Sequence, residues 1–151
     1  MYRIESSMQI KATPEQVWAL ANDVKRYPEW VAPTDRVVEA PAGGLSLGAV
    51  YREYGGIAPF KSESRWEVME FEPVRRQVHE GDDGKMRMRL TISLRPSEGG
   101  TFVTQGVELT PRWFLLPLSL VMWPLLMRRR GNAAMRETLA NAKRILEGGT
   151  G

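Results

Sequence analysis

The chain has 151 residues, enough for one domain that buries about two-thirds of its unfolded surface and too few for two domains. Hydrophobic residues make up 42% and charged residues 26% of the sequence, as in globular domains, which excludes wholesale disorder. Cysteine is absent and His79 is the only histidine, which excludes disulfide frameworks, thiolate metal sites and sites built on two imidazoles. We therefore expect one domain over residues 1–151, with no metal and no cofactor.

The net charge of +3 is concentrated at one end of the chain. Residues 1–127 hold 15 basic and 16 acidic side chains, net −1, whereas residues 128–151 hold 6 and 2, net +4. A local cluster does not make the broad basic face of a duplex-binding domain, so we expect no nucleic-acid partner. Residues 1–10 contain no apolar core of a signal peptide, and the absence of cysteine suits a reducing compartment, so we expect a cytoplasmic location.

The first thirty residues predict a strand followed by short helices. Apolar and polar side chains alternate over residues 2–10, the period of a half-buried strand. Thr13-Pro14-Glu15 then supplies a helix N-cap, a proline at the first helical position and an early negative charge. A helix of about two turns is therefore expected here, and Asn22-Asp23 favours another short helical turn over residues 24–26.

Residues 35–110 read as a series of strands separated by Gly, Pro and Asp. The expected strands are 35–40, 47–54, 60–71, 74–80, 85–95 and 101–110, with Gly55-Gly56 as one of the turns. Their short connections favour antiparallel pairing. In the fifth of these strands Met86, Met88 and Leu90 alternate with charged residues, which predicts one covered and one wet face.

A helix near the end of the chain is the candidate cover for this sheet. Apolar residues at helical spacing over residues 117–147 predict it, and Pro117 and Pro124 predict a bend or break in its first half. The expected core-facing stripe is Leu118, Val121, Leu125, Met135, Leu139, Ala142 and Leu146.

Several segments resemble the START/Bet v 1-like (SRPBCC) superfamily, in particular its polyketide cyclase/dehydrase and coenzyme-Q-binding branches. The resemblance rests on residues 10–18 (IKATPEQVW), residues 22–30 (NDVKRYPEW), Phe71-Glu72-Pro73, residues 100–104 and residues 142–147. It implies an α+β helix-grip fold, in which a curved antiparallel sheet of about seven strands wraps a long C-terminal helix. It also implies a cavity between sheet and helix for a small hydrophobic ligand, such as a lipid, an isoprenoid quinone or a polyketide-like molecule. The matching residues are turn, cap and packing residues, so they do not identify the chemistry.

Strand alternation assigns the lining of such a cavity. The candidate binding residues are Tyr51, Ser62, Ser64, Trp66, Val68, Met86, Met88, Leu90, Val103, Gln105, Val107, Leu118 and Met122. Ser62, Ser64 and Gln105, together with Tyr51 or Arg76, are the polar members that would orient a carbonyl or hydroxyl group. A filled core without a ligand is the alternative, since methionine also serves as an ordinary gap-filler.

The same alternation places His79, Arg87 and Arg89 toward solvent, because Val78 takes the apolar parity of its strand. Asp82-Asp83 precede Gly84 as a hairpin turn. No catalytic residue of the resembling cyclases can be matched here, so ligand binding or transport is the leading hypothesis. A polyketide cyclase/dehydrase-type enzyme acting on a cavity-bound substrate is the alternative, and an interaction module, such as a toxin-like or assembly protein, is a third class.

Residues 113–127 form a run without charge, followed directly by Arg128, Arg129 and Arg130. A bilayer-spanning helix needs about 20 apolar residues, so this run is too short to cross a membrane. It predicts a bent gate that lines the cavity. The alternatives are a peripheral membrane contact made together with residues 128–130, and a homodimer interface. We expect some of Trp113, Phe114, Leu116, Val121 and Trp123 to be exposed or covered by a partner.

Overall fold

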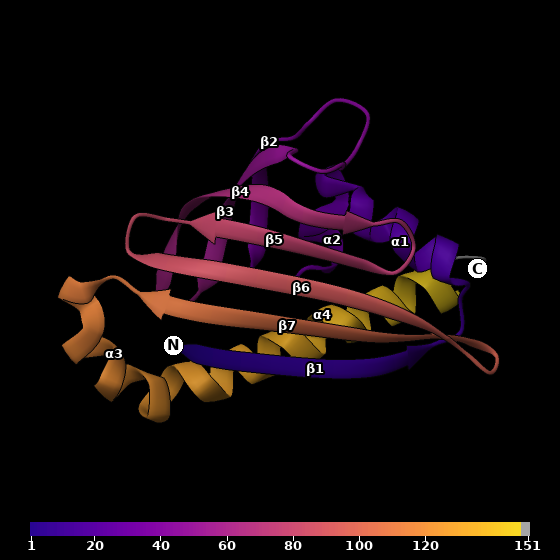
Figure 1. Cartoon of the computed structure of the whole chain (residues 1–151). Coiled ribbons are helices and arrows are strands. Elements are labelled where there is room, and N and C mark those ends of the chain that lie inside the picture. The colour runs from indigo at the N-terminus through magenta and orange to yellow at the C-terminus, as the bar shows by residue number, and fades with distance from the viewer. Residues whose placement is uncertain (149–151) are drawn as a thin grey trace.

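The computed structural model describes residues 1–148 as one antiparallel sheet of seven strands with helices against its concave face (Figure 1). The strands are β1 (Tyr2–Ile10), β2 (Thr34–Glu39), β3 (Val50–Ile57), β4 (Phe60–Glu72), β5 (Arg76–Asp82), β6 (Met86–Ser97) and β7 (Gly100–Pro111). The helical elements are α1 (Pro14–Asn22), η1 (Val24–Arg26), α2 (Tyr27–Trp30), η2 (Trp113–Leu115), α3 (Leu116–Met122), η3 (Trp123–Met127) and α4 (Arg128–Gly148). The expected α+β helix-grip architecture is confirmed.

The strand order is β1-β7-β6-β5-β4-β3-β2, so the first strand closes against the last. The alternation over residues 2–10 is confirmed, with Ile4 and Ile10 buried and Arg3 and Glu5 exposed. The expected cap of α1 is present as a complete capping box, in which Thr13 Oγ1 accepts from the Gln16 amide at 3.1 Å.

Several strand boundaries differ by one to three residues from the sequence prediction, and two of the differences have local reasons. β5 begins at Arg76 and not at residue 74, because Val74 lies in the preceding turn with φ 64°. Gly55 and Gly56 lie within β3, and the chain turns at Ala58-Pro59 instead. A Cβ on Gly55 would lie 1.9 Å from the Pro33 carbonyl oxygen, so glycine is needed there for close approach of the backbones.

Helix α4 covers one side of the concave face and closes the core. Met135, Leu139 and Ala142 of the expected stripe are buried. Gly131 lets the helix approach β1, because a Cβ at this position would lie 2.3 Å from Ile4 Cδ1. The long helix and the first strand are therefore packed directly on each other.

The first half of the expected stripe is wrong. Leu118, Val121 and Leu125 are exposed, and no residue of η2, α3 or η3 is buried. The helical path bends where η3, a π-type turn containing Pro124, joins α3 to α4, so the two halves do not share one face (Figure 1). The predicted bend and the predicted exposure of this segment are both confirmed.

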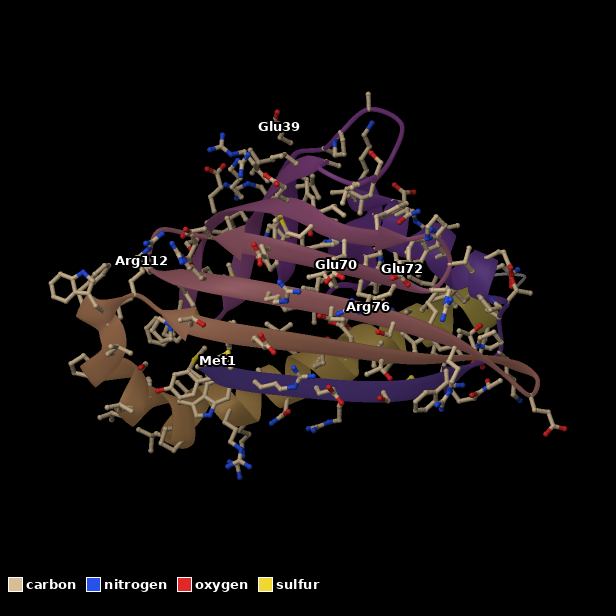
Figure 2. All side chains as sticks on the ribbon, viewed as in Figure 1. Met1, Glu39, Glu70, Glu72, Arg76 and Arg112 are labelled. Atoms are coloured by element: carbon tan, nitrogen blue, oxygen red, sulfur yellow. The ribbon has the colours of Figure 1, made fainter. Side chains whose placement is uncertain are left out.

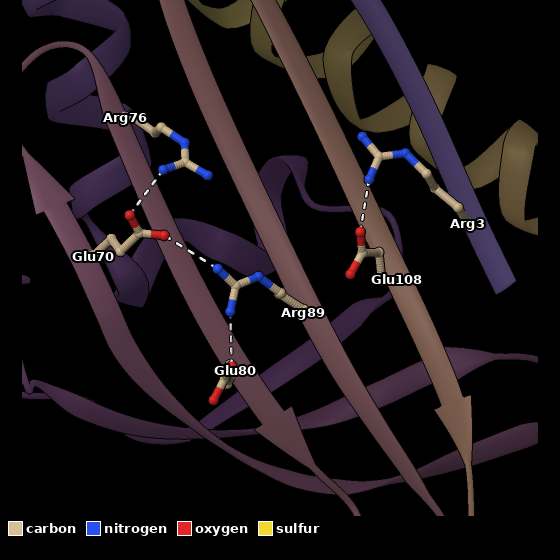
Figure 3. Close-up of polar contacts among 6 residues, drawn as sticks. All are labelled: Arg3, Glu70, Arg76, Glu80, Arg89 and Glu108. Carbon is tan, nitrogen blue, oxygen red and sulfur yellow. Dashed lines mark hydrogen bonds and ion pairs between the residues drawn. The ribbon is translucent and has the colours of Figure 1, made fainter. Parts of the chain in front are cut away.

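The convex face carries an ion-pair lattice across β4, β5 and β6 (Figure 3). Glu70 accepts from Arg76 at 2.9 Å and from Arg89 at 3.1 Å, and Arg89 also donates to Glu80 at 2.9 Å. Arg76 was a candidate for the inner face, and this prediction is wrong because the strand directs its guanidinium to the outer lattice. Val78 lies on the same outer face and is nevertheless fully buried.

Candidate functional site

The concave face of the sheet has a filled half and a partly open half. Ile92 of β6 and Val103 of β7 are buried among residues of α1 and α4. Farther along the same face, Met88, Leu90 and Val107 remain half-buried, as do Met86 and Leu109. These side chains are an apolar wall that the helices do not fully cover.

Trp66 is positioned against this wall by a glycine. Its indole lies flat over Gly81 of the neighbouring strand, where an added Cβ would be only 2.6 Å from the ring. Trp66 Nε1 donates to Ser64 Oγ at 2.8 Å, and the ring stacks on Tyr51 with centroids 6.2 Å apart. Trp66, Ser64 and Tyr51 are thus brought together on the inner face, and their polar atoms are hydrogen-bonded within the protein.

His79 is fully buried on the concave face, so the prediction that it faces solvent is wrong. It pairs with Val68 and Leu90, whereas Val78 pairs with Glu70 and Thr91 on the opposite face. Burial of Val78 under the outer ion pairs made it an unreliable marker of the inner face.

Four side chains form a hydrogen-bonded chain around this histidine. Tyr51 Oη lies 2.7 Å from His79 Nδ1, and His79 Nε2 lies 2.7 Å from Gln77 Oε1. Gln77 Nε2 donates to Asn22 Oδ1 at 2.5 Å, which leaves Gln77 Oε1 as an acceptor. His79 is therefore neutral with its proton on Nε2, and its Nδ1 accepts from the Tyr51 hydroxyl.

Two titratable groups of the inner face have pKa values shifted by burial. Desolvation lowers the pKa of His79 to about 4. Desolvation also raises the pKa of Glu53 to about 7, although a hydrogen bond from Thr34 Oγ1 at 2.9 Å opposes this shift. Glu53 of β3 pairs with Ser64 and lies on the inner face, a position that was not predicted. The sequence does indicate this position, because Glu53 lies two residues after Tyr51 in the same strand and must point to the same face.

A cavity of about 20 Å³ lies between the sheet and α1, α2 and α4. A space of this size holds about one water molecule, so the core is closed and does not contain the ligand cavity that the family resemblance implied. Val103 and Gln105 are its only predicted binding residues, and it is also lined by Trp30. Gln105 Oε1 and Trp30 Nε1 are buried without a hydrogen-bond partner.

The remaining predicted site residues lie apart from this cavity. Val68 is buried in the core, and Ser62 Oγ is half-buried and donates to Asp83 at 2.8 Å. Leu118 is exposed and Met122 is half-buried, both on α3. A larger cavity of about 350 Å³ lies outside the grip, between α1, η1 and residues 40–44. No predicted residue lines it.

The sheet, the gripped helix and the concave apolar wall define a helix-grip domain. A model of the family described as "Polyketide cyclase / dehydrase and lipid transport" matches residues 1–147. The chain therefore belongs to this family, as its sequence motifs indicated.

The chain is also similar to individual proteins. It is 24% identical to Toxin Rv0910 of Mycobacterium tuberculosis over 149 residues, 98% of this chain and 100% of that protein. The solution structure of the Polyketide_cyc-like protein Cgl2372 from Corynebacterium glutamicum is 29% identical, with TM-score 0.65 and coverage of 98% and 93%. The Zhui aromatase/cyclase from Streptomyces sp. R1128 shares the fold, with TM-score 0.76, 17% identity and coverage of 99% and 98%. These relationships support hydrophobic ligand binding or a cyclase-type function and do not distinguish the two.

Proposed function

We propose that the chain binds and carries a small, mostly apolar molecule that bears a hydroxyl or similar hydrogen-bond donor. The apolar body lies along Met88, Leu90 and Val107, and the donor reaches Gln105 Oε1. The rest of the binding face is formed by the other predicted residues on the inner strands, among them Tyr51, Ser64 and Trp66. Val103 lies beside Gln105, at the end of the wall that is nearest the small cavity.

The buried, unpartnered Gln105 carries this proposal. Gln105 pairs with Ile92 of the filled half, and the next residue on its face, Val107, belongs to the partly open half. A buried polar atom left without a partner costs about 1–3 kcal/mol, which a ligand hydroxyl would recover. The hydroxyls of Tyr51, Ser62 and Ser64 are already hydrogen-bonded to protein groups, so Gln105 is the better candidate.

Binding requires the helices to move, because the cavity beside Gln105 is about 20 Å³ and small-molecule sites are typically about 300 Å³ or more. On the helix side this cavity is bounded by α1, α2 and α4, so these helices must move away from the sheet. Such a movement would extend the apolar wall without disturbing the sheet.

A test places a bulky side chain on the wall. Leu90→Trp fills the binding face, and Arg87→Trp adds the same side chain to the outer face of the same strand as a matched control. We expect Leu90→Trp to lower the affinity for the apolar fluorescent probe 1-anilinonaphthalene-8-sulfonate at least tenfold while Arg87→Trp leaves it unchanged. Equal affinities for both variants would overturn the proposal. Native mass spectrometry of the purified protein would identify a copurified ligand.

A cyclase/dehydrase reaction is the second candidate, favoured by the structural likeness to an aromatase/cyclase. A carrier releases its ligand chemically unchanged, whereas an enzyme converts it and loses turnover when one polar group is removed while binding persists. Gln105→Leu removes a polar group, whereas Leu90→Trp fills the binding face. Loss of turnover with retained binding in Gln105→Leu would indicate an enzyme.

A cytoplasmic location and a homodimer remain predictions from the sequence.

A further inference from the structure

The helical segment that begins at Trp113 turns an apolar face away from the protein. Trp113 is 82%, Leu120 69% and Leu125 74% exposed. Phe114, Leu116, Leu118 and Val121 are also exposed. In Figure 2 the side chains of this segment fan outward at the end of the molecule where α3 lies. A solvent-facing helix surface is normally polar, so this face lacks its partner.

The opposite side of the segment is anchored to β1. Tyr2 stacks on Trp123 with ring centroids 4.6 Å apart, and its hydroxyl lies 3.0 Å from Ser119 Oγ. The segment is therefore held in a defined orientation, which keeps its outer face directed to solvent.

A cationic edge borders this apolar face. Arg128, Arg129 and Arg130 follow directly and are all exposed, and the sequence has no acidic residue between Glu108 and Glu137. Within residues 1–148, no ion pair joins an acidic side chain to any of these three arginines. Arg130 donates to the Ala58 carbonyl oxygen at 2.6 Å, so it also holds the β3–β4 hairpin.

We propose that residues 113–130 are a docking surface for an anionic lipid bilayer. The exposed apolar side chains enter the boundary between headgroups and acyl chains, where tryptophan is favoured, and the arginines meet the anionic headgroups. Within residues 1–148 no helix has the length and hydropathy for a bilayer crossing, so the contact is peripheral. This docking does not depend on a ligand on the concave face.

The charge favours a bilayer over a second copy of the chain. In a two-fold interface the same patch faces itself, so the interface would contain the arginine runs of both copies. Like charges would then oppose association, whereas anionic headgroups neutralise the same arginines.

The test is cosedimentation of the full chain with vesicles of phosphatidylcholine alone and of phosphatidylcholine mixed equally with phosphatidylglycerol. We expect binding to the anionic vesicles that weakens as salt is raised. Each arginine near an anionic surface changes the partition coefficient by about fivefold, so Arg128→Gln with Arg129→Gln should lower it by about 25-fold. Arg130 is left intact because of its bond to the hairpin.

The matched control is Arg75→Gln with Arg144→Gln. It removes the same charge from the β4–β5 turn and the C-terminal end of α4, at the other end of the molecule (Figure 1). We expect this control to bind like the unchanged chain. A second variant, Leu120→Gln with Leu125→Gln, keeps every arginine and should still lose most of the binding.

Fluorescence locates the contact. Addition of anionic vesicles should shift the tryptophan emission of the chain to shorter wavelength, and Trp113→Phe should remove most of this shift.

Equal loss of binding in the two arginine variants would overturn the proposal, because it would show a nonspecific charge effect. An absence of binding to both vesicle types would also overturn it, and a dimer in sedimentation equilibrium that Leu120→Gln with Leu125→Gln dissociates would assign the face to a second copy.

Discussion

His79 is the residue whose environment determines how the core responds to acid. In the folded chain the pKa of His79 is about 4, whereas an unfolded histidine has a pKa of about 6.5. The unfolded state therefore binds the proton more readily between these values. Stability is fully retained above pH 6.5 and declines as the pH falls toward 4.

We predict that this proton lowers the free energy of unfolding by on the order of 3 kcal/mol between pH 6.5 and 4. Because the chain has a single histidine, its imidazole signals in ¹⁵N NMR are unambiguous. They should report the Nε2–H tautomer at pH 7 and no titration above pH 5. An imidazole that titrates near pH 6.5 would contradict the buried position.

Glu53 has the opposite pH dependence. Its folded pKa of about 7 lies above the value of about 4.5 for an unfolded glutamate, so stability is fully present below pH 4.5 and is lost as the pH rises through 7. We predict that Glu53→Gln, which can still accept from Thr34, raises the free energy of unfolding by on the order of 3 kcal/mol at pH 8 and leaves it unchanged at pH 4. Urea unfolding at the two pH values measures this.

Glu67→Gln is the control, because Glu67 lies on the outer face of β4 beside Arg65. It should change stability by less than about 0.5 kcal/mol at either pH. A similar gain in both variants at pH 8 would assign the effect to net charge and not to the inner carboxyl.

At the scale of elements, the contact between β4 and β5 depends on Gly81. A Cβ there would lie within 2.6 Å of the Trp66 ring, which is rigid and packed against Tyr51. We predict that Gly81→Ala lowers the free energy of unfolding by about 1–3 kcal/mol, as overpacking does in other cores. Thermal or urea unfolding of the variant checks this.

Gly106 of β7 is a suitable control, since a Cβ at Gly106 would find its nearest neighbours at 3.5 Å or more. Gly106→Ala should be neutral or slightly stabilising, because alanine restricts the unfolded chain. Equal destabilisation by both substitutions would mean that loss of glycine flexibility, and not the Trp66 ring, is responsible.

Where local signals determine structure, the predictions are confirmed. Alternation, together with the Gly, Pro and Asp residues between strands, predicted seven strands, Thr13 predicted the α1 cap, and Pro117 and Pro124 predicted the bend before α4. The predictions for His79 and Arg76 are wrong because the face of a short strand depends on its pairing register, and one residue of shift reverses every side chain. The register irregularity between Val68 and Glu70 has no signal in the sequence. The hydrogen-bonded chain to Asn22 joins residues 55 positions apart and could not be predicted either.

At the scale of the whole molecule, the core and the apolar segment differ in how firmly they are held. α4 has buried residues along its length, whereas none of residues 113–127 is buried. Segments with few buried contacts open locally more often than the core does. We predict faster amide hydrogen exchange over residues 113–127 than over residues 131–142, measured by mass spectrometry. Equal exchange in the two segments would contradict this prediction.

The pairing of β1 with β7 has a consequence for synthesis of the chain. Tyr2 pairs with Leu109 and Ile10 with Thr101, so during translation the first strand of this sheet cannot pair until the last strand has been made. Contacts this distant in sequence close slowly, and translation adds only about 5–20 residues per second. During that time β1 has no sheet neighbour. A nascent chain halted before residue 100 therefore exposes Ile4, Met8 and Ile10, and this is the interval in which a chaperone would be needed.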